Sequence, residues 1–259
     1  MAAVQDTVRT GVPVARSALS GTIMSTPKRL ARIAGVLYLI VGIFGGFALA
    51  YVSPLVYVPG DATATAAKVA ANADLVRIGV LADLLQATVF VFLAMTLYLL
   101  LSRIQRSVAT AMVILVAIAT TIMCLDKVFQ FAALRVTTDP SYASALGVAG
   151  SNALVLLLLD IHNYGYLIAQ IFFGLWLVPL GYLAYTSKMF PRALGVVLIA
   201  AGISYVLDLL VAFVSPELSR TLHVYFAILP TIAEVWMLGY LLLFGVRNAP
   251  SHGRAAAAA

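Results

Sequence analysis

The 259-residue chain is 63% hydrophobic and only 10% charged, with a formal net charge of +6. Soluble domains usually carry about 25% charged residues, so this composition argues against a soluble fold and favours a membrane protein. Most basic residues lie in short segments beside long apolar runs, and no basic surface interleaved with aromatic residues is visible. We therefore expect a lipid bilayer, and no nucleic acid, as the partner.

The first 23 residues contain no long apolar run and are rich in Arg, Thr, Ser, Gly and Pro, so we predict a disordered extension over residues 1–23. Met24 opens the segment MSTPKRLARIAG, which is typical of a membrane-protein start, and we hypothesise that it is the initiator. We expect a transmembrane helical domain over residues 24–246 and a disordered cytoplasmic tail over residues 247–259.

Six apolar segments follow, and each is long enough to cross a bilayer, which needs about 20 apolar residues per helix. They cover approximately Ile33–Val52, Leu75–Leu101, Val108–Leu134, residues 153–185, Leu194–Val214 and Thr221–Phe244. The sequence therefore predicts an all-α fold, a polytopic transmembrane helical bundle with six spanning helices. The fourth segment is too long for one straight span, so we assign its first part, up to Leu159, to an outer-surface or tilted piece. If this segment forms two spans, the total becomes seven.

The connections between these segments carry helix-breaking residues. Pro54 is expected to end or kink the first helix, because proline lacks the backbone N–H that a helix needs. Residues 59–74 read as a polar loop with a short Thr/Ala-rich surface helix, and residues 135–151 as a loop that contains Asp139-Pro140. Ser215-Pro216 should end the fifth segment.

Two small features predict packing inside the protein. Gly42 and Gly46 form a GxxxG pair, for which we favour an internal packing face over a dimer interface. Cys124, the one cysteine, lies within an apolar run and is expected to be a small buried side chain.

The distribution of basic residues predicts the orientation, because cytoplasmic loops carry an excess of Lys and Arg. With the N-terminus inside, eleven basic residues are inner: Arg9, Arg16, Lys28, Arg29, Arg32, Arg103, Arg106, Lys188, Arg192, Arg247 and Arg254. Five are outer: Lys68, Arg77, Lys127, Arg135 and Arg220. We expect a multi-pass protein of the cell (inner) membrane with both termini in the cytoplasm.

Polar and ionisable residues inside the apolar segments are the candidates for function, because they are costly to bury in a bilayer. The candidates for a ligand or ion pocket are Asp83, Gln86, Asp126, Lys127, Gln130, Asp160, His162, Tyr166, Gln170, Asp208 and Glu234. In the predicted orientation the aspartates and His162 fall in the outer half of the membrane, and Glu234 falls nearer the middle. This common depth predicts an outward-facing polar cavity or a buried ionic network.

Helical spacing places several of these residues on shared faces. The pairs and stripes are His162, Tyr166 and Gln170 (i, i+4, i+8), Asp126 and Gln130, Ser204 and Asp208, and Asp83 and Gln86. A structural interpretation competes with the functional one: Lys127, Arg77 or Arg135 would pair with the acids and hold the helices together.

Motifs for metal binding and catalysis are missing from the sequence. It contains no HExxH pair, no GxSxG motif and no glycine-rich phosphate loop, so we predict neither a metal nor a cofactor. The plausible metal-binding histidines are limited to His162 and His223. No catalytic residue is identified, although an acid/base role for His162 or Glu234 stays open.

The strongest resemblance to a known family lies between Asp160 and Asp208. It is carried by His162, Gly165-Tyr166, Phe172-Phe173-Gly174-Leu175, Leu180-Gly181-Tyr182, the corner Ser187 to Arg192, Leu194-Gly195 and Gly202. Further points are Arg32-Ile33-Ala34-Gly35, Leu37-Tyr38-Leu39, Asn72 through Arg77, Gly79 and Leu97-Tyr98-Leu99-Leu100. From about Met24 to Phe244 the chain resembles the uncharacterised bacterial multi-pass membrane family called domain of unknown function 4386. The resemblance implies a multi-helix membrane bundle and no particular activity.

Three hypotheses for function follow. The first is that the protein binds or transports a proton, a cation or a small polar ligand through an outward polar pocket. The alternatives are an intramembrane enzyme that acts on a lipid or small molecule, and a structural or interaction protein. The sequence leaves the ligand and the oligomeric state open.

Overall fold

The computed structural model describes residues 26–247. The predicted extension, Met24 and all of the predicted tail except Arg247 lie outside the described residues. Within residues 26–247 six helices are long and apolar enough to cross a membrane, and no strand occurs. The predicted all-α polytopic bundle with six candidate spans is confirmed.

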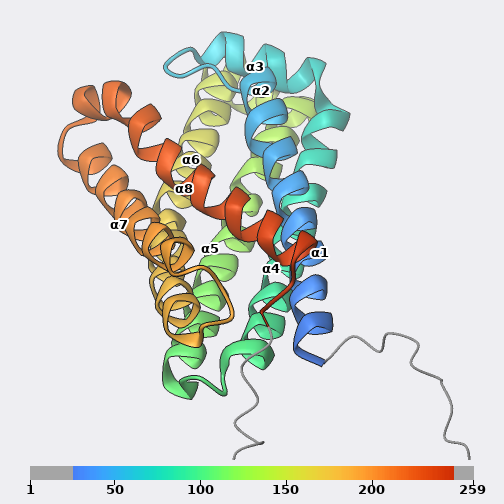
Figure 1. Ribbon diagram of the computed structural model, residues 1–259. Helices are drawn as coiled ribbons and strands as arrows, with labels where there is room; N and C mark the ends of the chain where they lie inside the picture. The colour runs from blue at the N-terminus through green and yellow to red at the C-terminus, as the bar shows by residue number, and fades with distance from the viewer. Residues whose placement is uncertain (1–25, 248–259) are drawn as a thin grey trace, which may run out of the picture.

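The helices form a ring in the order of the sequence (Figure 1). They are α1 (Thr26–Gly46), continued by η1 (Phe47–Val52) and α2 (Ser53–Val56), then α3 (Ala62–Ala71), α4 (Ala73–Leu101), α5 (Arg106–Thr138), α6 (Pro140–Ser187), α7 (Arg192–Val214) and α8 (Pro216–Leu243). Each long helix packs on the next one, and α8 crosses the bundle to return to α1. The short helix α3 covers one end of the bundle, which we call the α3 end. The described chain begins and ends at the opposite end.

The outside of the bundle is apolar. Ile43, Leu81, Leu125, Val128 and Leu243 are each more than half exposed. A water-soluble surface would not present so many large apolar side chains, whereas lipid tails accept them. The bundle therefore has the surface of a protein in a lipid bilayer.

Pro54 does not end the first helix. The backbone instead widens into a six-residue π-helix, η1, and continues through α2 to Val56. Pro54 lies in the first turn of α2, where a missing N–H costs little. The chain leaves the helix at Tyr57, which has an extended backbone.

The predicted surface helix between residues 59 and 74 is confirmed as α3. Asp61 caps it, because its carboxylate accepts a hydrogen bond from the Ala64 N–H at 2.8 Å. The buried side chains of Ala66 and Val69 pack into a small apolar cluster with residues of α5 and α6. This contact attaches α3 to the end of the bundle.

The predicted loop over residues 135–151 is wrong. Helix α5 continues to Thr138, and α6 begins at Pro140 after the single residue Asp139. Proline is well suited to the first helical position, and Asp139 accepts hydrogen bonds from the N–H and hydroxyl of Ser141. These hydrogen bonds lower the pKa of Asp139. Further along α6, Gly147 has a φ of 73° and is the one residue in this helix with a non-helical backbone.

The fourth apolar segment is part of one long helix after Gly147. Its first part, which was predicted to be an outer-surface or tilted piece, contributes the buried Val155 and Leu159 to the cluster beneath α3. The whole segment belongs to one of the six candidate spans and is not divided into two.

Helices α6 and α7 touch through glycines in the half of the bundle away from α3. A Cβ atom added to Gly181 would lie 2.6 Å from the Gly195 carbonyl oxygen, and one added to Gly202 would lie 2.6 Å from that of Gly174. Gly42 and Gly46, which were predicted to pack internally, instead have nothing within 4 Å of such an atom. Cys124 is likewise exposed and not buried. The spacing of small residues identified smooth helix faces but not which of them meets another helix.

These contacts predict the effect of two matched substitutions. Gly181→Ala should destabilise the solubilised protein by about 1–3 kcal/mol, because its new methyl group overlaps the α7 backbone. Gly42→Ala makes the same chemical change on an open face and should leave the melting temperature unchanged or slightly raised. Thermal unfolding of both variants in one detergent checks this, and equal melting temperatures would contradict the α6–α7 packing.

Candidate functional site

A buried ionic cluster joins α4, α5 and α6 near the α3 end. Lys127 on α5 places its Nζ atom 2.8 Å from Asp83 Oδ2 on α4 and 3.6 Å from Asp126 Oδ2. The other oxygen of Asp126 is hydrogen-bonded to His162 Nδ1 on α6. Asp126 is only 3% exposed and Lys127 only 5%. Charges buried this far are tolerated when they are paired, as these are.

Local sequence explains why these side chains meet. Asp126 and Lys127 are adjacent on α5, so one reaches toward α6 and the other toward α4. Gly165, one turn after His162, lies against Asp126, where an added Cβ atom would be 3.0 Å from the Asp126 Cβ. The absence of a side chain at Gly165 lets α6 approach closely enough for the imidazole to reach the carboxylate.

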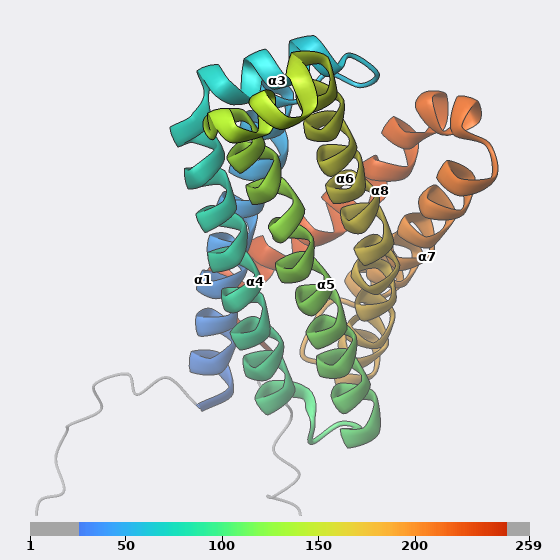
Figure 2. The ribbon, with the colours of Figure 1, turned by 180° about the vertical axis from the view of Figure 1, so that it is seen from behind.

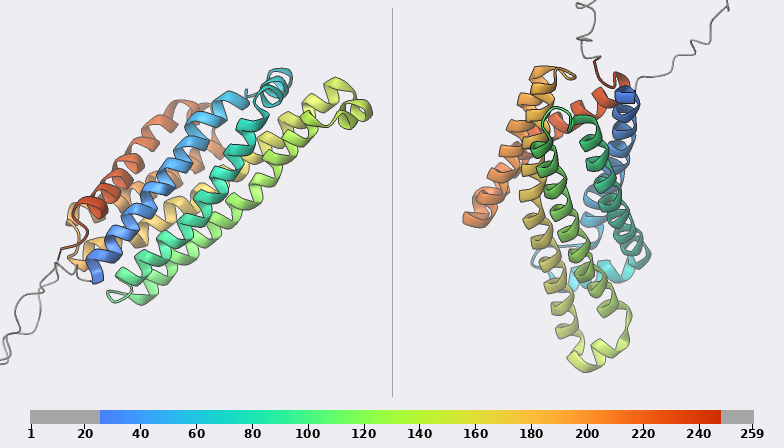
Figure 3. Two further views of the ribbon diagram at one scale, coloured as in Figure 1. Left: turned by 90° about the vertical axis from the view of Figure 1, so that its right-hand side faces the viewer. Right: turned by 90° about the horizontal axis from the view of Figure 1, so that it is seen from below.

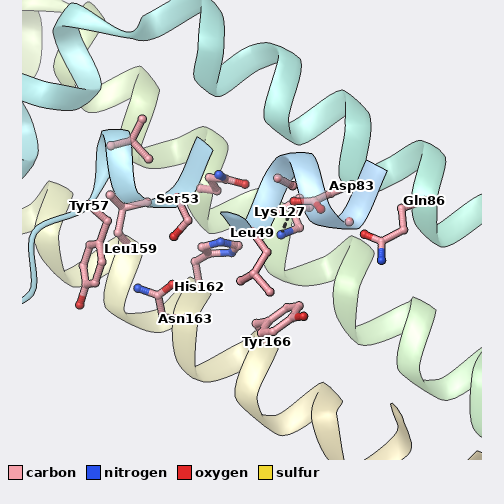
Figure 4. Close-up of a pocket in the computed structure, with 14 residues that line it drawn as sticks. Leu49, Ser53, Tyr57, Asp83, Gln86, Lys127, Leu159, His162, Asn163 and Tyr166 are labelled. Atoms are coloured by element: carbon pink, nitrogen blue, oxygen red, sulfur yellow. Dashed lines mark ion pairs between the residues drawn. The ribbon is translucent and has the colours of Figure 1, made fainter. Parts of the chain in front are cut away.

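Three members of the cluster, Asp83, Lys127 and His162, line a cavity of about 50 Å³ together with Ser53 and Asn163 (Figure 4), and Asp126 lies behind them, outside the lining. One water molecule needs roughly 10–15 Å³ of such space, so this cavity holds a few waters or one small ion. The amides of Gln86 and Gln130 complete its polar wall. A Cβ atom at Gly45 would overlap Gln86, so this glycine makes room for the amide.

A wider and more open pocket of about 640 Å³ adjoins this cavity and extends from Gly60, beside α3, to Gln170 of α6 and His223 of α8. Asp160 and Tyr57 both line this pocket, and the Asp160 carboxylate accepts a hydrogen bond from the Tyr57 hydroxyl at 2.5 Å. Burial, together with this hydrogen bond, raises the pKa of Tyr57 to about 12, so the phenol remains a donor at neutral pH. Tyr57, Asn163 and Tyr166 line both spaces, so the wide pocket is the vestibule of the ionic cavity.

A third pocket of about 100 Å³ lies deeper and contains Glu234 of α8. Glu234 accepts hydrogen bonds from the hydroxyls of Tyr38 on α1 at 2.9 Å and Tyr205 on α7 at 3.1 Å. Gln86 also lines the ionic cavity, Gln170 also lines the vestibule, and Tyr166 lines all three spaces. The vestibule and the ionic cavity thus lie beside each other, and both adjoin the deeper Glu234 pocket.

Below Glu234 the lining becomes apolar on all sides. Phe90 of α4 stacks on Phe173 of α6 at 5.9 Å between ring centroids and meets the edge of Trp176 at 5.0 Å. Beyond these rings lies the main apolar core, with Leu93, Leu97, Met112, Leu177 and Leu180 fully buried. The pocket series is therefore closed toward the end opposite α3.

Asp208 lines none of these three pockets, although its hydrogen-bond partner His223 lines the vestibule. Its carboxylate is 2.8 Å from His223 Nδ1 on α8, and Ser204, one turn earlier, donates to the Phe226 carbonyl oxygen at 2.9 Å. Figures 1 and 2 both show the α7–α8 corner set away from α6, and the right-hand view of Figure 3 shows the same separation. Asp208 shares a depth with the ionic cluster but not a contact.

Among the three basic residues predicted to pair with the buried acids, Lys127 does so. Arg77 pairs with Asp74 and Arg135 with Asp139, each on the surface. Within residues 26–247 no group of three or more His, Cys, Asp or Glu side chains is placed to hold a metal ion.

The polar pocket residues that were not predicted as site residues include Tyr38, Tyr205, Tyr57, Ser53 and Asn163. Tyr38 and Tyr205 lie in strongly apolar helices, where a tyrosine ordinarily reads as packing, so only the three-dimensional contact with Glu234 identifies them. The position of Asn163 directly after His162 in the sequence was the signal that could have identified it as a site residue.

Comparison with known proteins assigns the chain to a family. A family model described as "Domain of unknown function (DUF4386)" matches residues 33–245, and the chain belongs to that family. No match was found among curated proteins or among solved structures.

The ionic cluster predicts a large stability effect at one position. Lys127→Met removes the ammonium group and leaves Asp83 and Asp126 without their shared counter-ion, which should cost about 3–5 kcal/mol. Asp74→Asn, which breaks the exposed pair with Arg77, should cost about 1 kcal/mol or less.

Thermal unfolding is measured for both variants and for the double variant Lys127→Met/Asp83→Asn, and the differences in stability report the strength of the Lys127–Asp83 ion pair. The double variant should recover part of the loss, because it removes one of the uncompensated charges. A Lys127→Met protein that melts with the wild type would contradict the buried ion pair.

Proposed function

We propose that the protein binds a proton, a monovalent cation or a small polar ligand in the ionic cavity, and that the ligand enters through the vestibule at the α3 end. The observation that carries this proposal is that the buried charges line a cavity connected to a wider pocket. Charges that served only to hold helices together would need no adjoining space.

The charge balance of the cluster indicates what the cavity would accept. Asp83 and Asp126 supply two negative charges, and Lys127 supplies one positive charge. With a neutral imidazole at His162 the cluster is one positive charge short. A proton on His162 or a monovalent cation beside the carboxylates would complete it.

The unpaired acceptor atoms point the same way. Asp126 Oδ2 and Gln130 Oε1 are buried without a hydrogen-bond partner. Buried acceptors are rarely left unpaired. Gln130 lines the cavity, so a water, a cation or a ligand N–H there would satisfy its oxygen, whereas Asp126 Oδ2 has Lys127 Nζ at 3.6 Å.

The orientation of the basic residues suggests the side from which the ligand enters. Among residues 26–247 the excess of Lys and Arg lies at the end opposite α3, and the positive-inside rule supports a cytoplasmic side for that end. The vestibule would then open to the outside of the inner membrane. Transport, as distinct from binding, would need a second conformation in which the apolar layer beneath Glu234 opens.

A ligand-dependent thermal shift tests the binding. Purified protein is melted across a pH series and with Li⁺, Na⁺, K⁺ and small polar metabolites, using wild type, Asp126→Asn and the exposed control Asp74→Asn. A ligand at 100 times its Kd adds about 2.7 kcal/mol of stability. We expect at least one condition to stabilise the wild type and the control but not Asp126→Asn.

The opposite result would favour the structural alternative. If Asp126→Asn melts earlier but responds to every condition as the wild type does, the ionic cluster only holds the helices together.

A second candidate function is hydrolysis or acyl transfer within the membrane. It is favoured by the Asp126–His162 pair, because a carboxylate on Nδ1 orients an imidazole as a general base, and by Ser53, which lines the same cavity (Figure 4). A fluorophosphonate probe should then label wild type but neither Ser53→Ala nor His162→Ala. No labelling of folded wild-type protein would remove this candidate.

A further inference from the structure

We propose that the deep pocket around Glu234 is a separate binding site for a small organic ammonium ion, that is, a protonated primary or secondary amine. This inference goes beyond the ionic cavity, because none of Asp83, Asp126, Lys127 and His162 lines the deep pocket. It rests on three independent features: an acid without a basic partner, an aromatic wall and an unpaired amide oxygen.

Glu234 has no basic partner in the described part of the chain. The ion pairs there involve seven pairs of other residues, and the hydrogen bonds to Glu234 come from the neutral phenols Tyr38 and Tyr205. A carboxylate in the middle of a helical bundle is costly without a counter-charge. The pocket at Glu234 therefore offers a place for one positive charge.

Aromatic rings form most of the remaining wall. Tyr38, Phe90, Tyr166, Phe173, Trp176 and Tyr205 line the pocket together with Glu234. The negative faces of aromatic rings attract organic cations, and this attraction is strongest where water is excluded. Bare Na⁺ or K⁺ prefers a complete shell of oxygen ligands. Oxygen atoms here come from Glu234, the two amides and the phenols, and the rings of Phe90, Phe173 and Trp176 interrupt that shell. The composition thus favours an ammonium ion with carbon substituents over an inorganic cation.

Gln170 specifies the kind of ammonium ion. Its side chain is 9% exposed, lines the deep pocket, and has an amide oxygen without a hydrogen-bond partner. A primary or secondary ammonium ion carries N–H groups that can donate to this oxygen and to Glu234. A quaternary ammonium ion carries none, and would leave the oxygen unpaired at a cost.

The volume limits the size of the ligand. The pocket provides about 100 Å³, which holds several water molecules or one ammonium ion with a few carbon atoms. Gln170 and Tyr166 also line the vestibule, so the way in from the α3 end passes these two residues.

Trp176 in the pocket wall provides a direct readout. The chain has two tryptophans, and Trp236→Phe leaves Trp176 as the single tryptophan, whose fluorescence is excited selectively at the red edge of the absorption band. This protein is titrated in detergent with methylammonium, dimethylammonium and tetramethylammonium chloride, and with NaCl and KCl at matched ionic strength. We expect saturable fluorescence changes with methylammonium and dimethylammonium, about tenfold weaker binding of tetramethylammonium, and no saturable change with either salt.

Three variants assign the response to the pocket. Glu234→Gln should weaken methylammonium binding by about tenfold or more, because the counter-charge is lost. Gln170→Leu should weaken methylammonium but not tetramethylammonium, since only the former uses the amide oxygen. Glu217→Gln makes the same change as Glu234→Gln at an exposed position of the same helix and should bind like the parent protein.

The proposal is overturned if no ammonium ion changes the fluorescence, if NaCl or KCl gives the same saturable change, or if Glu234→Gln titrates like the parent. If Glu234→Gln does not yield folded protein, Gln170→Leu decides. An unchanged preference for methylammonium over tetramethylammonium in that variant would overturn the proposal. These outcomes are separate from the test of the ionic cavity, because the variants there leave Glu234 and Gln170 intact.

Discussion

The contact between Lys127 and the two aspartates is the interaction on which the polar half of the bundle depends. A single ammonium group lies 2.8 Å from Asp83 and 3.6 Å from Asp126, and the latter carboxylate also binds His162. In a bilayer none of these charges would be tolerated alone. Because the partners come from α4, α5 and α6, satisfying the charges also fixes how these three helices pack and creates the cavity between them.

The same three helices divide the interior into a polar part and an apolar part. Toward α3 they contribute charges and amides, and beyond Phe90, Phe173 and Trp176 they contribute aliphatic side chains to the main core. Glu234 lies at this boundary, where α1, α7 and α8 supply the carboxylate and its two phenol donors. A ligand in the vestibule would reach the ionic cavity past Tyr57 and Asn163, or the Glu234 pocket past Tyr166 and Gln170. Beyond Glu234 it would meet a closed apolar layer.

The sequence predicted the six helices and the buried acids, because long uncharged runs and rare charges are strong signals in a membrane protein. It also included Lys127 among the partners of the acids. It failed at residues 135–151, where a proline and two glycines suggested a loop, since Asp139 and Pro140 begin a helix instead. The sequence also led us to group Asp208 with the other acids, because the position of a residue along its helix predicts its depth in the membrane. The sequence does not show that the α7–α8 corner is set away from α6. The hydrogen bonds from Tyr38 and Tyr205 to Glu234 could not be predicted either, because they join helices that are far apart in the sequence.

The most direct test of the account is the accessibility of the cavity from each side of the membrane. Asn163 lines both the ionic cavity and its vestibule, and Ser107 is exposed at the α4–α5 corner at the opposite end. Cysteine is placed at each position in a Cys124→Ala background and treated with a membrane-impermeant thiol reagent. The account predicts that Asn163→Cys reacts in intact cells and that Ser107→Cys reacts only after permeabilisation. Failure of Asn163→Cys to react, or reaction only after permeabilisation, would contradict an outward-facing pocket.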